Sequence, residues 1–206
     1  MGVFTPLFLL AMILHRNSQK RIYLNNAIYF ITFKTKDNYP YFKEQIFCDL
    51  FVEELKLCMK IKQFTLYAFN VLCEHIHLML QPTGKYNYSQ IVQFIKRHTS
   101  RNINILTLPE GEFGQIRLHD NTMDKCVKEY RKIFIDKYRI NQFTIPTFQW
   151  QHSFYDHIIR NEMDFQRHWQ YISYNHLKHG LPENWKYTSL NFEYNKALFN
   201  HYHNLL

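Results

Sequence analysis

The 206-residue sequence lacks several patterns that mark common protein classes. Its four cysteines form no Cys-x-x-Cys pair, which excludes a zinc ribbon and a thioredoxin-like redox centre. No glycine-rich phosphate loop ending in lysine is present, so chemistry driven by ATP is not expected. Only five glycines interrupt the chain, and no internal repeat appears. The sequence therefore predicts a globular protein whose cysteines are buried free thiols in a reducing compartment.

The sequence also lacks an apolar run long enough to cross a bilayer. Residues 3–14 are apolar but include Pro6, and a membrane-spanning helix needs about 20 residues. No positive charge precedes this run and no small-residue cleavage site follows it, so a secretory signal is not expected. We expect residues 1–19 to form a packed apolar arm, with an upstream start that is not used in nature as the alternative, and we expect no membrane partner.

Aromatic side chains and positive charge are abundant. Aromatic residues make up 17% and hydrophobic residues 46% of the chain, which favours a folded protein. The net charge of +8 suits a polyanionic partner, because contacts with phosphates release counterions. Six of the basic residues lie in residues 122–141, which form either a solvated helix face or a surface that contacts phosphates.

Hydrophobic periodicity predicts alternating strands and helices in one domain. Asn161 is a predicted N-cap of the last helix, and Gly180 is its predicted C-terminal stop. The order places helices against an antiparallel sheet, an α+β fold. The expected strands cover 27–36, 64–72, 75–81 and 149–160; the expected helices cover 43–62, 88–105, 122–141 and 162–178; a loop covers 109–120.

The segment His75-Ile76-His77 lies in one of the predicted strands. The two-residue period of a strand places both imidazoles on one face and Ile76 on the other. Two imidazoles on one face can share a divalent ion. In a chain with twelve histidines, two half-buried histidines without a metal are the alternative.

The predicted helix over 162–178 carries a polar stripe beside its apolar one. Tyr171 and Asn175 lie one turn apart on this stripe and project together. An amide oxygen could complete a site with two histidines, and a phenol beside the ion could attack the phosphate that the ion polarises. An ordinary aromatic on the flank of a helix is the alternative for Tyr171.

Several motifs then fall in an order that resembles a known family. The His75-Ile76-His77 strand resembles the HUH motif, and residues 150–185 resemble the C-terminal half of the REP-associated tyrosine transposases. These proteins are single-tyrosine HUH transposases and relatives of small insertion-sequence transposases. The matched residues are Trp150-Gln151, Asp156 to Arg160, Tyr171-Ile172, Asn175, Lys178 to Leu181 and Trp185. The sequence departs from the pattern at His176, where proline is usual, and at Glu74, where asparagine is frequent.

The resemblance implies a ferredoxin-like sheet of four or five antiparallel strands over a domain of residues 20–190, with a tail over 191–206. It implies Mg²⁺ or Mn²⁺ on His75 and His77, with Asn175 as the third ligand. It also implies that Tyr171 is the nucleophile, forming a 5′-phosphotyrosine and freeing a 3′-hydroxyl. Tyr155 is the competing nucleophile, and His157 is either a packing residue or a further ligand.

The expected partner is single-stranded DNA with hairpins, bound by a monomer or homodimer in the cytoplasm at the bacterial nucleoid. Two rival functions are a non-catalytic DNA-binding protein derived from such a transposase and a metal-dependent phosphodiesterase that uses water. The residues expected to contact DNA are basic: Lys96, Arg97, Arg101, Lys128, Arg131 and Lys132.

Overall fold

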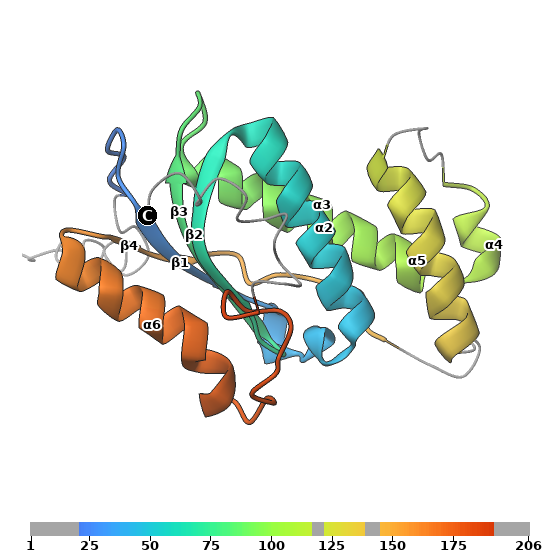
Figure 1. Cartoon of the computed structure of the whole chain (residues 1–206). Coiled ribbons are helices and arrows are strands. Elements are labelled where there is room, and N and C mark those ends of the chain that lie inside the picture. Colours follow the sequence, from blue (N-terminus) through green and yellow to red (C-terminus); the bar gives the residue numbers. More distant parts are fainter. Residues whose placement is uncertain (1–20, 117–121, 139–144, 192–206) are drawn as a thin grey trace, which may run out of the picture.

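The computed structural model describes residues 21–116, 122–138 and 145–191 (Figure 1). Its strands are β1 (Tyr29–Lys34), β2 (Phe64–Val71), β3 (His75–Pro82) and β4 (Tyr155–Ile158). Its helices are α2 (Gln45–Lys62), α3 (Tyr88–Thr107), α4 (Glu110–Phe113), α5 (Thr122–Tyr138) and α6 (Glu162–Lys178), with short 3-10 turns η1 (Lys36–Asn38) and η2 (Tyr41–Lys43).

The four strands form one antiparallel sheet in the order β2-β3-β1-β4. The chain passes from β1 through α2 to β2, turns directly into β3, and returns through α3 to β4. This is the ferredoxin-like arrangement, so the predicted α+β fold is confirmed. Four strands occur in the part of the chain that the structure describes.

The two faces of the sheet carry different layers of helix (Figure 1). On one face, alternate residues of the strands join α2 and α3 in the main hydrophobic core, with α5 packed outside them. On the other face, Phe30, Met79 and Ala68 form a smaller cluster with Ile172 of α6. The period of two therefore assigns Ile76 and Leu78 to the main core and His75 and His77 to the α6 face.

Helix α6 begins and ends where the sequence predicts. The Asn161 side chain accepts a hydrogen bond from the Asp164 N–H, as an N-cap does. Gly180 follows the helix with a φ of 68°, a left-handed conformation that glycine adopts without strain. These two helix ends fix which residues of α6 lie over the sheet.

Two predicted boundaries are wrong. The strand expected over 149–160 shortens to β4, because Trp150 leaves the sheet edge after one bridge to Thr35 and packs against Phe33. The expected loop over 109–120 contains the short helix α4. The apolar arm, the tail beyond Asn191 and the end of the helix expected to reach 141 lie outside the described residues. No helix that the structure describes is long and apolar enough for a membrane span.

Candidate active site

The two histidines of the HUH strand lie next to each other on the face of the sheet towards α6. The Nε2 atoms of His75 and His77 lie 3.1 Å apart. Two neighbouring ligands of an octahedral ion, each bound at about 2.1 Å, are separated by about 3 Å. The spacing of the two imidazoles therefore fits one shared divalent ion.

The opposite ring nitrogens are held by neighbouring side chains. Glu74 Oε1 lies 2.8 Å from His75 Nδ1, and Thr32 Oγ1 lies 2.7 Å from His77 Nδ1. The Asn175 amide donates from Nδ2 to His77 Nε2 over 2.8 Å, which requires a lone pair on that nitrogen. His77 then carries its proton on Nδ1 and donates it to Thr32. Partners on the outer nitrogens are what metal-binding histidines need to fix ring and tautomer.

Both imidazoles are buried, and burial determines their protonation. Burial is the largest cause that lowers the pKa of His77, and the neighbouring His75 acts in the same direction; the resulting pKa is about 3. Burial also lowers the pKa of His75, although its hydrogen bond to Glu74 acts in the opposite direction. Both rings are therefore neutral at pH 7, which is the form that binds a metal.

Helix α6 supplies the amide and the phenol that the sequence predicts beside the histidines. Asn175 is buried against His77, and the ring centroid of Tyr171 lies 5.2 Å from that of His77. The Tyr171 side chain is still 41% exposed, so a substrate can reach it. One subunit thus brings together all four residues expected at the site.

His75, His77 and Tyr171 border a pocket of about 570 Å³. Sequence reasoning missed several of its other lining residues. The strand register contained the signal for two of them, because Thr32 pairs with His77 and Lys34 pairs with His75. Tyr155, the competing nucleophile, also lines the pocket and is 55% exposed. The remaining lining residues are Phe30, Glu74, Arg167, His168 and His179.

The basic residues expected to contact DNA lie elsewhere, on α3 and α5 over the opposite face of the sheet. Arg97, Lys128 and Lys132 are exposed there. Lys96 donates to the main-chain carbonyl of Gln151, and burial lowers its pKa to about 8. Arg101 forms an ion pair with Asp124.

One member of this set needs correction. Arg131 is only 2% exposed, and its guanidinium donates to the carbonyls of Ile105 and Leu106 near the end of α3. Its charge satisfies carbonyls that the end of a helix leaves unpaired. Arg131 therefore stabilises the α3–α5 contact and does not present its charge to DNA.

Comparisons with known proteins agree with this fold. Residues 23–110 match the family model described as "Transposase IS200 like". Over these residues the chain is similar to IS200-like transposases, and its sheet has the HUH fold.

The chain is also similar to the REP-associated tyrosine transposases. A Haemophilus influenzae protein of that name is 25% identical over 177 residues, which cover 84% of this chain and 85% of the relative. A solved structure of a REP-associated tyrosine transposase bound to a REP hairpin shares the fold, with a TM-score of 0.59 and 17% identity. That match covers 88% of this chain and 87% of the other. The resemblance expected from the motifs is thus confirmed.

Proposed function

We propose that the protein cleaves and rejoins single-stranded or hairpin DNA through a 5′-phosphotyrosine on Tyr171. The observation that carries this proposal is the meeting of a half-exposed phenol with a buried, neutral histidine pair in one pocket. A tyrosine that only filled space would be expected to pack in the apolar cluster under α6, as Phe165 and Trp169 do.

His75, His77 and Asn175 would hold Mg²⁺ or Mn²⁺. The bound ion supplies polarisation of the scissile phosphate and stabilisation of the charge that develops on it. The chain's own contribution is to keep both imidazoles neutral by burial and to orient them through the contacts of Thr32 and Glu74 with the outer ring nitrogens. An amide turned so that its oxygen faces His77 would complete the set of ligands.

Tyr171 attacks the phosphorus in line and remains bonded to the 5′-phosphate, while the 3′-hydroxyl leaves. The bond energy is conserved in the intermediate, so a 3′-hydroxyl of the same or another strand can reverse the step without ATP. Lys34 and Arg167 line the pocket with positive charge and would bind the phosphates beside the cut.

The substrate class rests on charge and on a relative. The solved relative with the same fold is bound to a REP hairpin. An open pocket beside Lys34 and Arg167 suits a strand whose backbone is not held in a long duplex. We therefore propose single-stranded DNA with hairpins as the partner, with Lys96, Arg97, Arg101, Lys128 and Lys132 as outlying contacts.

The test is a covalent adduct assay on the full chain. DNA flanking the protein's own gene is labelled at its 3′ end, incubated with Mn²⁺ and run on a denaturing gel. A 5′-phosphotyrosine keeps the 3′ fragment on the protein, so we expect a shifted band for the wild type and none for Tyr171→Phe. The matched control is Tyr174→Phe, which alters an exposed tyrosine of α6 that does not line the pocket.

Each rival function gives a different outcome in this assay. A water-using phosphodiesterase would cut the DNA without any shifted band, and Tyr171→Phe would cut as well as the wild type. A non-catalytic DNA-binding protein would retain the DNA on a native gel but would not cut it. Loss of the adduct in Tyr155→Phe, with retention in Tyr171→Phe, would make Tyr155 the nucleophile.

A further inference from the structure

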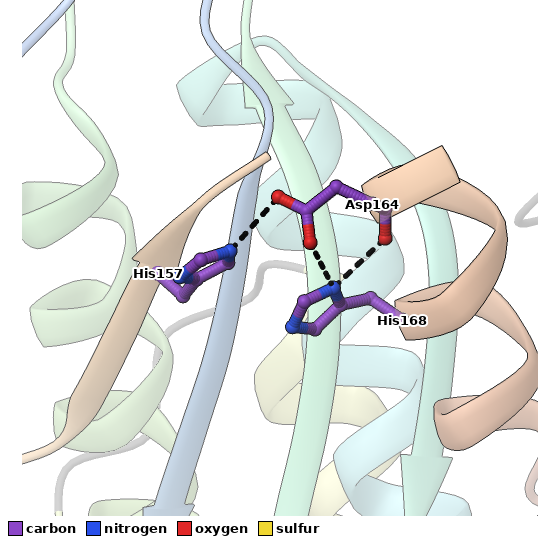
Figure 2. A group of neighbouring side chains, drawn as sticks. All are labelled: His157, Asp164 and His168. Carbon is purple, nitrogen blue, oxygen red and sulfur yellow. Dashed lines mark hydrogen bonds and ion pairs between the residues drawn. The ribbon is translucent and has the colours of Figure 1, made fainter. Parts of the chain in front are cut away.

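A second polar cluster lies beside the histidine pair, between β4 and the first turns of α6 (Figure 2). Asp164 is its centre. One carboxylate oxygen lies 3.0 Å from His157 Nε2, and the other lies 3.1 Å from His168 Nδ1. Partial burial acts to raise the pKa of Asp164, but the hydrogen bonds from His157 and the Arg160 N–H lower it overall. The carboxylate is therefore ionised at neutral pH.

The contacts of His168 fix the position of its proton. Its Nδ1 lies 2.8 Å from the main-chain carbonyl oxygen of Asp164, as well as close to the carboxylate. A carbonyl oxygen can only accept, so Nδ1 carries the hydrogen and Nε2 carries the lone pair. A metal ion between these three residues would have to displace this hydrogen, so the contacts favour an oriented histidine over a metal site.

The other ring nitrogen of His168, Nε2, is the one that could act in the pocket of the proposed nucleophile. Figure 2 shows this nitrogen turned away from Asp164, and His168 lines the same pocket as Tyr171. The two residues are three positions apart on α6, so they share one face of the helix. Phe30 contacts both rings, with centroid distances of 4.9 Å to His168 and 5.9 Å to Tyr171.

We propose that His168 is the general base that takes the phenolic proton of Tyr171; this rests on the proposed function. As the bond from Tyr171 Oη to phosphorus forms and the bond from phosphorus to the 3′-oxygen breaks, the phenolic proton moves to His168 Nε2. The 3′-oxygen takes its proton from water. In the rejoining step a 3′-hydroxyl gives its proton to water, and the imidazolium returns its own proton to Tyr171.

Asp164 and His157 are positioning residues in this scheme. The carboxylate holds the His168 ring and stabilises the imidazolium that proton transfer creates, as an acid does behind a catalytic histidine. His157, from the neighbouring strand, binds the other carboxylate oxygen, and its ring stacks on His168 at a centroid distance of 4.7 Å. A side chain from β4 thus keeps the first turn of α6 in register with the pocket.

The test uses two variants of His168 in the adduct assay under single-turnover conditions. His168→Asn keeps an N–H next to Cγ that can donate to Asp164 but has no Nε2, so folding should be retained. A positioned general base contributes roughly 10²–10⁴-fold, and we expect His168→Asn to form the adduct about 100-fold more slowly. His168→Ala should be equally slow and should regain rate with added imidazole, because the pocket is open.

Four outcomes decide the proposal. Slow reaction of both variants, with imidazole rescue of His168→Ala but not of Tyr171→Phe, would support it. A His168→Asn variant that reacts at the wild-type rate would overturn it, as would a slow His168→Ala variant that imidazole fails to rescue. Absence of any adduct from the wild type would instead overturn the proposed function, and this inference with it. The wild type in the same imidazole buffer controls for capture of Mn²⁺ by imidazole.

Discussion

The two faces of the sheet are built from the same strands but have opposite chemistry. The face towards α2 and α3 buries alternate apolar side chains such as Ile76 and Leu78 in the main hydrophobic core. The face towards α6 carries His75 and His77 at an open pocket. Along β3, successive residues therefore alternate between packing in the main core and lining the proposed active site.

This division explains how the site keeps its geometry. The main core fixes the backbone of β1 and β3, so residues on the other side inherit a rigid spacing. The α6 face has only a small apolar cluster, with Ile172 and Met79 among its members. α6 is therefore held by less apolar contact than the helices of the main core. Polar contacts, such as the one between Asn175 and His77, also hold it in place.

The largest expected effect comes from the polar side of β3. His77→Ala removes a proposed ligand and leaves Thr32 without its imidazole partner. We expect no detectable DNA adduct, as for the wild type in excess chelator, while the protein stays folded. Circular dichroism checks the fold, and the adduct gel checks the chemistry. An adduct of normal yield in chelator would show that the histidine pair serves packing rather than a metal.

The neighbouring residue should behave in the opposite way. Leu78→Ala removes a fully buried side chain from the main core and leaves a cavity. We expect a loss of about 2–5 kcal/mol in the free energy of unfolding, measured by urea denaturation. The fraction that remains folded should form the adduct at the wild-type rate. A stable but inactive Leu78→Ala would break the division between the two faces.

We also expect the two faces to contribute differently to the pH dependence of the protein's stability. On the site face, the folded-state pKa of His77, about 3, lies below its ordinary 6.5. The unfolded chain binds the extra proton between these values, so stability falls as the pH drops from 6.5. On the core side, where Glu54 of α2 meets Asn102 of α3, burial raises the pKa of Glu54 from 4.5 to about 7. Its folded form binds the extra proton, so stability falls as the pH rises from 4.5.

Two variants separate these contributions, with metal removed by chelator. His77→Gln should flatten the acid side of the stability profile. Glu54→Gln, which keeps a partner for Asn102, should raise the free energy of unfolding at pH 8 by on the order of 1–3 kcal/mol. Urea denaturation at several pH values measures both. Parallel profiles for the wild type and Glu54→Gln would refute the charge-burial argument.

Local pattern predicted the fold and much of the site. The two-residue period of β3 and the spacing of Tyr171 and Asn175 on α6 each placed side chains on a face, and the structure shows those faces meeting. The sequence did not show what lies across a strand pair. Thr32 and Lys34 were missed because register depends on tertiary pairing, not on local period.

The burial of individual polar side chains was the second feature that the sequence did not reveal. Arg131 looked like its exposed neighbours in a basic helix, but it lies in the seam between α3 and α5. A basic residue on the inner side of an amphipathic helix gives no local sign of its partner, because the carbonyls it binds are 25 and 26 residues away in the sequence. The sequence likewise did not show the contact between His168 of α6 and His157 of β4, because the two residues belong to different elements.

The smallest expected effect distinguishes the two faces as DNA-binding surfaces. In a Tyr171→Phe background, which prevents the reaction, Lys34→Ala removes a charge from the pocket rim. Each contact with a phosphate of a single strand contributes about 0.7 to the slope of log affinity against log salt. We expect Lys34→Ala to lower the slope by about this amount, and Lys132→Ala to lower it less, because Lys132 lies on α5, beyond the α2 and α3 layer. Fluorescence anisotropy across a salt series measures both slopes. The reverse ranking would mean that the α5 surface, not the pocket rim, holds the DNA backbone.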